Sequence, residues 1–354
     1  MKLVSVVIPT YNRAHCLART IDSALQQTYS CLEVIVVDDG STDGTPDLIR
    51  RRYGNRISYV YQENSGASSA RNAAFRIARG EYIALLDSDD VWRPWKIELQ
   101  VACMQARPEI GMIWTDMTGI ASDGTVISDR YMRQMYAAYR YFRKEDLFHQ
   151  KYPLSTVAPS LAGQLPNAHL YVGDAFSQIV IGNLVTTPTV LLSRERLALV
   201  KGFDTELRDA GEDHDFHLRT SRYGPVGFID LSSVDVQRGR PDQLTTGCKL
   251  PIAINYLKTL SRALMEDRDR ITLPDSLIRS AQANAHQWVG YLLMAQEGRI
   301  AEARRHLCRS LRYRAQLKTL SYLAKSIVPR SIWPALRGIR RYANKQPNPS
   351  GSML

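Results

Sequence analysis

The sequence predicts an α/β fold with a mostly parallel sheet flanked by helices, followed by a smaller all-α C-terminal region. Short β-branched runs alternate with helical patterns over the first 115 residues, and this alternation builds a parallel sheet covered on both faces. After about Thr246 only helical patterns follow. We therefore expect two halves of one domain, 1–118 and 119–245, then a helical basic region, 246–345, and a disordered tail, 346–354.

Each element of the first half is predicted from its local pattern. The predicted strands are β-branched apolar runs, at 4–9, 32–37, 57–61, 82–86 and 110–115. The predicted helices carry an apolar face or a start or stop signal, such as Thr45 as N-cap before Pro46, and Gly80 as terminator. They lie at 14–27, from 45 onwards, at 69–79 and at 94–106.

Three of these strands end in polar clusters, which are 10–12, Asp38 with Asp39, and 87–90. The carboxyl ends of parallel strands form the ligand-binding edge of such a sheet, so we expect the clusters to converge there. Residues 9–14 read Pro-Thr-Tyr-Asn-Arg-Ala, without the glycines of a dinucleotide-binding turn or a P-loop. Phosphates would have to be held in another way.

Asp87, Asp89 and Asp90 lie within four positions directly after an apolar run. Three carboxylates this close need a cation or solvent to ionise together. One interpretation is a polar loop in which Asp89 or Asp90 caps the next helix. The other is a site on Asp87 and Asp89 for Mg²⁺ or Mn²⁺, which prefer carboxylate oxygen and often bind together with substrate phosphates.

The region 119–175 mixes aromatic and basic residues and leaves two interpretations open. It is either an amphipathic helix that packs its aromatic residues inward or a wall for a ring-shaped acceptor. Single-stranded nucleic acid is also bound by such mixtures, but we do not expect a nucleic-acid partner. The residues are Arg130, Tyr131, Arg133, Tyr136, Tyr139, Arg140, Tyr141, Phe142, Arg143, Lys144, Phe148 and Tyr152.

Composition indicates a cytoplasmic protein. Five cysteines without close pairing fit a reducing compartment and give no zinc pattern. No apolar run approaches the roughly 18–20 residues that cross a bilayer, and the N-terminus lacks the pattern of a signal peptide. Residues 283–317 predict a helical hairpin of tetratricopeptide type with a break at 297–299.

The net charge of +11 is concentrated near the C-terminus. Residues 299–345 contain 13 Lys or Arg and one acid, so this segment carries +12, whereas the remaining 33 basic and 34 acidic residues leave −1. Apolar side chains are interleaved with these charges, which predicts peripheral attachment to an anionic membrane face. The alternative is a solvated basic helical domain. The interleaved residues are Ile327, Val328, Ile332, Trp333, Leu336 and Ile339.

Taken together, the motifs resemble glycosyltransferase family 2, whose members have the GT-A fold. The resemblance covers about 3–245 and rests on the order and spacing of seven segments, at 4–13, 36–45, 66–72, 80–83, 86–90, 95–98 and 211–213. It implies a nucleotide-sugar-binding half in 1–118 and an acceptor-binding half in 119–245. It also implies an inverting transfer from a nucleoside diphosphate sugar, with a UDP-sugar favoured, to a glycan or lipid-linked acceptor.

The resemblance assigns roles to individual residues. Tyr11 would stack on the nucleotide base, Asp39 would accept a hydrogen bond from the base, and Arg71 would lie near the nucleotide. Asp87 and Asp89 would form the D-x-D metal motif, and Asp213 would be the general base, with Glu212 as the second candidate. Further nucleotide contacts are expected from Pro9, Thr10, Arg13, Asp87 and Ser88, and donor or acceptor contacts from Asp90, Trp92, Arg238 and Arg240.

One departure concerns the stretch after the last strand. Many family members hold the diphosphate there with a histidine, whereas residues 236–245 contain none, so Arg238 or Arg240 would replace it. His214 and His217 are interpreted as scaffold or acceptor contacts and not as metal ligands. A catalytically silent nucleotide-sugar-binding module is the alternative function.

Overall fold

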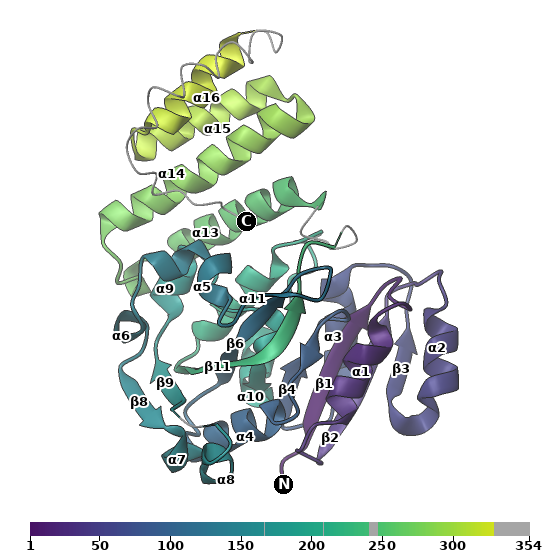
Figure 1. Cartoon of the computed structure of the whole chain (residues 1–354). Helices are drawn as coiled ribbons and strands as arrows, with labels where there is room; N and C mark the ends of the chain where they lie inside the picture. The colour runs from purple at the N-terminus through teal and green to yellow at the C-terminus, as the bar shows by residue number, and fades with distance from the viewer. Residues whose placement is uncertain (166, 208, 241–246, 329–354) are drawn as a thin grey trace. The chain divides into compact units, whose positions relative to one another are not determined.

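A computed structural model describes residues 1–165, 167–207, 209–240 and 247–328 (Figure 1). The chain divides into two compact units, Met1–Thr246 and Gly247–Leu354. Among the described residues, no helix has both the length and the apolar character needed to cross a membrane. The expectations for 241–245, for the tail 346–354 and for Ile332, Trp333, Leu336 and Ile339 lie outside the described residues.

The first unit is built on one mixed sheet. Its described strands run in the order β3-β2-β1-β4-β10-β6-β11-β9-β8, with β5 paired to β11 and β7 to β6. Their bounds are Val4–Thr10 (β1), Leu32–Asp38 (β2), Ser58–Tyr61 (β3), Tyr82–Leu85 (β4), Val91–Trp92 (β5), Met112–Ile120 (β6), Val126–Ser128 (β7), Gln150–Pro153 (β8), His169–Gly173 (β9), Leu191–Ser193 (β10) and Val226–Gln237 (β11).

The strands β3, β2, β1 and β4 are parallel to one another, and β6 is parallel to β11. The strand β10 lies between β4 and β6 and is antiparallel to both, and β9 and β8 continue the sheet in antiparallel fashion. The predicted fold class, an α/β sheet flanked by helices and followed by a helical region, is confirmed, and its sheet is mixed, with parallel strands in the first half.

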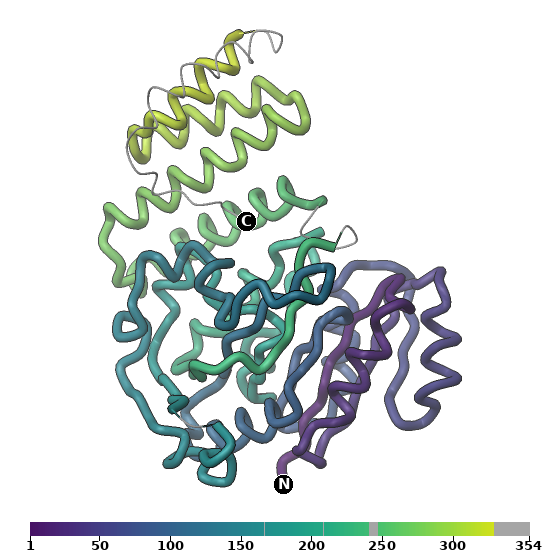
Figure 2. The backbone as a smooth tube through the Cα atoms, viewed as in Figure 1, coloured from purple at the N-terminus to yellow at the C-terminus, as the bar shows by residue number. Residues whose placement is uncertain are grey.

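Helices flank this sheet, as the ribbon and the backbone tube show (Figures 1 and 2). The helix α3 packs on β1 and β2, α1 packs on β5 and β2, and α10 packs on α11. The bounds are Leu17–Leu25 (α1), Thr45–Arg52 (α2), Ala67–Ile77 (α3), Lys96–Ala106 (α4), Met132–Met135 (α5), Lys144–Leu147 (α6), Leu154–Val157 (α7), Pro159–Ala162 (α8), Phe176–Val180 (α9), Arg194–Val200 (α10) and Glu212–Ser221 (α11).

Several element boundaries differ from the prediction by one to five residues, and two of these differences have clear local reasons. The first helix begins at Leu17 because Asn12 has a left-handed backbone (φ 52°) and the carbonyl of Arg13 accepts hydrogen bonds from the amides of Cys16 and Leu17. The strand predicted at 110–115 extends to Ile120 in β6, because its pairing with β11 continues through two register shifts.

Residues 119–175 do not form the long amphipathic helix that was one of the two interpretations. Where the structure describes them, they form the end of β6 and then short pieces, β7, α5, α6, β8, α7, α8 and β9, with a 3-10 turn at Ala137–Arg140. The inward packing that this interpretation required is nevertheless present, because Tyr139, Phe142 and Phe148 are buried. Tyr141 remains about half exposed.

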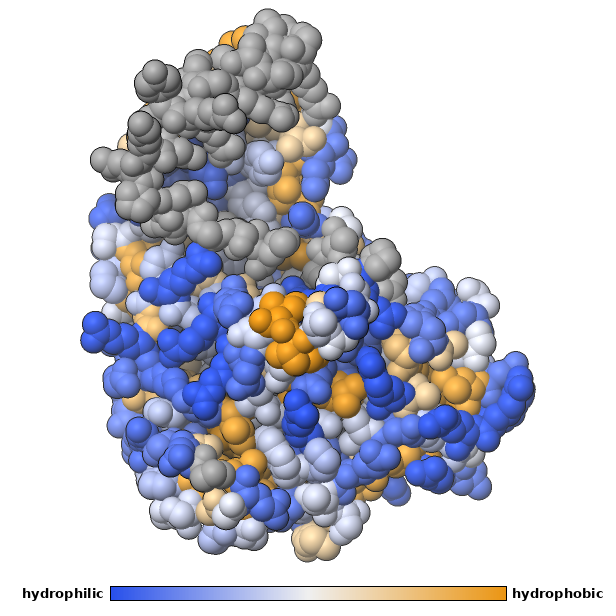
Figure 3. Space-filling view, in the orientation of Figure 1, coloured by the Kyte–Doolittle hydropathy of each residue, from blue (hydrophilic) through white to orange (hydrophobic). Residues whose placement is uncertain are grey.

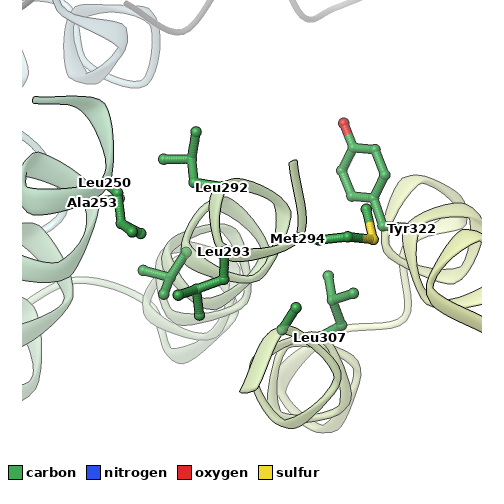
Figure 4. Packing of buried hydrophobic residues seen from close by; sticks show 9 residues of the cluster. Leu250, Ala253, Leu292, Leu293, Met294, Leu307 and Tyr322 are labelled. Atoms are coloured by element: carbon green, nitrogen blue, oxygen red, sulfur yellow. The ribbon is translucent and has the colours of Figure 1, made fainter. Parts of the chain in front are cut away.

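The described part of the second unit contains the helices α13 (Lys249–Glu266), α14 (Asp275–Leu292), α15 (Ile300–Tyr313) and α16 (Leu317–Ile327). The predicted break between α14 and α15 is confirmed, since Gly298 has a left-handed backbone (φ 67°). A side chain at Gly290 would come within about 3 Å of Leu307 and the Ala303 carbonyl, so glycine lets these helices approach closely. Figure 4 shows the shared core, to which Leu293, Met294, Leu307 and Tyr322 contribute.

A cavity of about 280 Å³ also lies within this second unit. Its apolar wall comes from α13 and α14, and its polar residues come from the start of α15 and from α13. The lining residues are Ile254, Leu257, Lys258, Ser261, Val289, Leu293, Arg299, Glu302 and His306. None of them belongs to the predicted catalytic motifs, which all lie in the first unit.

Candidate active site

The structure brings the three polar strand ends together. The strand β1 lies between β2 and β4, and its register pairs Thr10 with Asp38. The Asp39 amide donates to the Thr10 carbonyl at 2.8 Å, and the Leu86 amide donates to the Val7 carbonyl at 3.0 Å. The clusters after β1, β2 and β4 therefore share one edge of the sheet. Figure 3 shows hydrophilic side chains over much of this face of the first unit, interrupted by separate apolar groups.

Asp39 organises the loop that leads into α3. Its Oδ1 accepts hydrogen bonds from Gln62 Nε2 at 2.6 Å and the Ser65 amide at 2.9 Å, and its Oδ2 accepts from the Gly66 amide at 2.8 Å. A carboxylate offers about four acceptor positions, so one remains for a ligand. Tyr11 follows β1 with its side chain 49% exposed. An exposed aromatic ring beside a partly occupied carboxylate suits a planar base.

Four further predicted nucleotide contacts are Pro9, Thr10, Arg13 and Ser88. Pro9 and Thr10 are buried at the end of β1, and the Thr10 hydroxyl has no partner among the described residues. The Ser88 carbonyl accepts from the Thr20 hydroxyl at 2.9 Å. Arg13 is close enough for its charge to lower the pKa of Asp89. The acidic loop is thus held against the helix that follows β1.

The acidic loop holds carboxylates that resist ionisation. Burial, and then the charge of Asp87, raises the pKa of Asp89. Burial, followed by Asp89 and Asp87, raises the pKa of Asp90 well above its ordinary value, although Asp90 Oδ1 accepts from the Gln237 amide at 3.2 Å. The capping interpretation is wrong, because α4 begins at Lys96 after Trp95 and no side chain caps it.

These acids fit a divalent cation in their chemistry but form no complete ligand cage. Among the described residues, no group of three or more His, Cys, Asp or Glu side chains is arranged to hold a metal. Mg²⁺ and Mn²⁺ commonly bind through one or two carboxylates together with substrate phosphates, which Asp87 and Asp89 can provide. Burial and then Asp87 raise the pKa of Asp89 although Arg13 and Arg240 act in the opposite direction, so a bound cation would favour its charged form.

Trp92, Arg238 and Arg240 take different places around this loop. Trp92 is buried, and its indole N–H donates to the Pro188 carbonyl at 2.8 Å, so the ring belongs to the core beneath the loop. The charge of Arg238 lowers the pKa of Asp90, and that of Arg240 lowers the pKa of Asp89. These two arginines, which follow β11, therefore lie close to the acidic loop.

Arg71 links the acidic loop to the predicted base. This buried side chain on α3 donates from Nη2 to Asp87 Oδ1 and from Nη1 to Glu212 Oε1, each at 2.8 Å. Its guanidinium also lies 4.9 Å from the ring centroid of Phe203. Burial opposes the charge, but Asp87 and then Glu212 raise the pKa of Arg71 above its usual value. One arginine thus joins segments 141 residues apart.

Asp213 lies in the first turn of α11 next to this link. Burial, and then the neighbouring Glu212, raises its pKa to about 7, while the His214 amide and Arg71 act in the opposite direction. Asp213 Oδ2 accepts a hydrogen bond from Asn183 Nδ2 at 3.2 Å. A carboxylate with a pKa near 7 is suited to taking up a proton at neutral pH.

Two residues near Asp213 were not assigned to the site from the sequence. They are Asn183, described above, and Tyr136, whose hydroxyl accepts from the Thr186 hydroxyl at 3.2 Å. Burial, and then Asp213, raises the pKa of Tyr136, to which Asp87 also contributes. No local pattern marks either residue, although Tyr136 stands in the aromatic region that we considered as an acceptor wall.

His214 and His217 lie on the inner face of α11. His214 Nε2 lies 2.7 Å from the Ile179 carbonyl, and His217 is fully buried. Burial lowers the pKa of both rings, to about 3 for His217. They are neutral parts of the scaffold behind Asp213, as the scaffold interpretation expects.

Comparisons with known proteins match part of the chain to a family. Residues 5–169 match the family described as glycosyl transferase family 2. The chain is 39% identical over 137 residues to chondroitin synthase of Escherichia coli, over 38% of this chain and 20% of that protein. It is 44% identical over 126 residues to the putative teichuronic acid biosynthesis glycosyltransferase TuaG of Bacillus subtilis, over 35% of this chain and 50% of TuaG. The matches thus span half or less of these relatives.

Solved structures share the fold at low sequence identity. S. aureus TarS 1–349 in complex with UDP-GlcNAc has a TM-score of 0.52 and 16% identity, and the match covers 92% of this chain and 91% of that chain. A longer S. aureus TarS structure gives a TM-score of 0.57 and 18% identity, covering 96% of this chain and 53% of that chain. Residues 5–169 thus match glycosyltransferase family 2, and the chain shares the GT-A-like fold of these solved structures.

Proposed function

We propose that this protein transfers a sugar from a nucleoside diphosphate sugar to a hydroxyl of a glycan, polysaccharide or lipid-linked acceptor, with inversion at the anomeric carbon. The observation that carries the proposal is the Arg71 link. One guanidinium nitrogen of Arg71, Nη2, binds Asp87, which follows β4. The other, Nη1, binds Glu212, which precedes Asp213 at the start of α11. A leaving group and an attacking hydroxyl need such opposed groups.

The donor half would bind the nucleotide at the ends of β1 and β2. The exposed ring of Tyr11 offers a stacking face, and Asp39 keeps one acceptor position for an N–H of the base. We favour a UDP-sugar because TarS, which shares the fold, is described in complex with UDP and with UDP-GlcNAc. Arg238 and Arg240, whose charges lower the pKa of Asp90 and Asp89, would compensate the phosphates in place of a histidine.

Asp87 and Asp89 would hold a divalent cation, Mn²⁺ or Mg²⁺. Such an ion, when bound, neutralises the charge that develops on the departing diphosphate. The residues themselves keep the two carboxylates close, oriented by Arg71 and by the attachment of Ser88 to α1. Asp90 fixes the end of β11 to the same loop through its bond to the Gln237 amide.

Asp213 would accept the proton of the attacking hydroxyl. Its pKa of about 7 means that much of it is ionised at neutral pH and is still basic enough to remove a proton. Asn183 holds one of its oxygens, and Tyr136 stands beside it where an acceptor sugar would lie. Direct attack from this side, opposite the diphosphate, gives inversion without a covalent intermediate.

We place this reaction in the cytoplasm. None of the five described cysteines, Cys16, Cys31, Cys103, Cys248 and Cys308, is in a disulfide, which suits a reducing compartment. The relatives named for chondroitin and teichuronic acid biosynthesis support a polysaccharide of the cell envelope as the product.

A panel of nucleotide sugars tests the proposal. Thermal unfolding of the full chain is measured with each donor, with and without Mn²⁺, followed by an assay of nucleoside diphosphate release. We expect one donor to raise the Tm in a Mn²⁺-dependent way and to be consumed when an acceptor is added. Stabilisation without turnover across a broad acceptor panel would favour the silent binding module, and no stabilisation by any donor would contradict both functions.

A further inference from the structure

The helix α16 buries residues that carry hydroxyls and exposes large apolar residues. Its buried side chains are Thr319, Tyr322 and Ser326, each of which carries a hydroxyl. Its outward side carries large apolar residues, with Leu317 86% exposed, Leu320 47% and Ile327 71%. Amphipathic helices normally bury the apolar stripe and expose the polar one.

The buried hydroxyls are specifically paired, so the inversion is built into the packing. The Thr319 hydroxyl accepts a hydrogen bond from Gln287 Nε2. The Ser326 hydroxyl accepts from Arg304 Nε at 3.1 Å and donates to the Leu323 carbonyl at 2.6 Å. The Tyr322 ring lies tilted against the Tyr291 ring, with 4.8 Å between the centroids, and joins the core cluster (Figure 4). Leu323 packs against this core, and rotating α16 to bury Leu317 and Leu320 as well would leave these polar groups unpaired.

The exposed apolar residues form one continuous stripe. Leu317, Leu320, Ala324 and Ile327 follow one another at intervals of three, four and three residues, which places them on one side of a helix. Lys318 and Lys325 follow the stripe members at 317 and 324 directly and therefore flank the stripe on one side. The stripe, defined as these four residues, precedes most of the apolar residues that the sequence analysis selected for membrane contact.

The surrounding charge selects the partner. Residues 299–328 contain eight Lys or Arg and one acid, a net charge of +7. A second copy of the chain would bring its own segment of +7 against this one and would be repelled. Residues 329–354 contain five Lys or Arg and no acid, so this segment of the same chain would be repelled as well. An anionic lipid surface offers acyl chains to the stripe and negative headgroups to the lysines.

We propose that α16 docks its outward stripe into the interface of an anionic membrane, with the basic side chains of α15 and α16 bound to the headgroups. The proposal concerns the second unit by itself and goes beyond the proposed catalysis. A protein that uses lipid-linked acceptors gains from such attachment, but the docking does not require that chemistry.

Co-sedimentation of the full chain with vesicles tests this proposal. Vesicles of phosphatidylcholine alone are compared with vesicles that also contain phosphatidylglycerol. We expect the wild type to bind only the anionic vesicles, with weaker binding at high salt. The double variant Leu317→Ser/Leu320→Ser should bind the anionic vesicles at least roughly ten-fold more weakly than the wild type, because interfacial affinity follows the apolar area inserted. Its Tm and its donor turnover should stay unchanged.

A matched control is Leu199→Ser, which removes a leucine of the first unit that is 52% exposed and should leave vesicle binding intact. Lys318→Gln removes one positive charge beside the stripe and should weaken binding to the anionic vesicles. Equal binding by the wild type and the double variant would overturn the proposal, as would equal binding to both vesicle types. Loss of self-association in the double variant without any vesicle binding would assign the stripe to a second copy and also overturn it.

Discussion

Replacing Arg71 with glutamine should weaken the fold and change the base at the same time. The wild-type side chain makes two charge-assisted hydrogen bonds of 2.8 Å, to Asp87 and Glu212, whose side chains are 31% and 13% exposed. Removing one partner from a buried ion pair costs about 3–5 kcal/mol. Because Asp87 is partly hydrated, we expect the lower end, about 3 kcal/mol, in the free energy of unfolding of the first unit in urea.

The same substitution should move the pH dependence of transfer. Arg71 lowers the pKa of Asp213, so its removal raises that pKa further, and the acid limb of the pH–rate profile shifts to higher pH. Arg51→Gln is a matched control, since Arg51 pairs with Asp47 at 3.3 Å with both side chains exposed, and it should cost less than about 1 kcal/mol. A loss below 1 kcal/mol for Arg71→Gln together with an unmoved acid limb would refute the link between the two halves of the site.

Three further predictions follow from the geometry. In the wild type, kcat should rise with pH through about 7, because Asp213 must lose its proton before it can act as a base; initial rates that level off above pH 5 would place the base elsewhere. Tyr11→Ala should raise the Kd for the donor about ten-fold at unchanged Tm, since stacking on an exposed ring contributes about 1–3 kcal/mol, and calorimetric titration that finds an unchanged Kd would exclude the stacking role. Asp89→Asn should raise the Tm of the ligand-free protein near pH 7, because a carboxyl whose pKa is raised by folding destabilises the fold at pH values above its unfolded pKa. The same substitution should abolish the stabilisation of the protein by Mn²⁺ with nucleotide. A lower Tm, or an intact Mn²⁺ response, would count against the cation site.

Features of the fold that depend on neighbouring residues could be predicted from the sequence. The polar clusters after β1, β2 and β4 meet because parallel strands share their carboxyl edge, and this needs only three strand ends to be recognised. The break at Gly298 follows from one residue that tolerates a left-handed backbone. The start of α1 was placed three residues early because the turn formed by Asn12 and Arg13 depends on a hydrogen bond to Ser41, 29 residues away.

Features that depend on distant contacts could not be predicted. The antiparallel insertion of β10 between β4 and β6 is decided by pairing across the whole sheet. The Arg71–Glu212 bond, and the positions of Asn183 and Tyr136 next to Asp213, join segments separated by 30 to 141 residues. The inversion of α16 was also missed, because a periodic apolar stripe is ordinarily assigned to the core and only the hydroxyl pairing of Thr319 and Ser326 decides which face is buried.

The most direct test of the proposed function is the rate of sugar transfer by Asp213→Asn, measured beside the Kd of the same variant for the donor. Asparagine keeps the shape of the side chain and removes its ability to take up a proton, so transfer should fall by at least 100-fold, in line with the usual contribution of a general base. The donor Kd should stay within about two-fold of the wild type, since Asp213 is proposed to contact the acceptor and not the donor. Transfer at the wild-type rate by this variant would contradict the central claim.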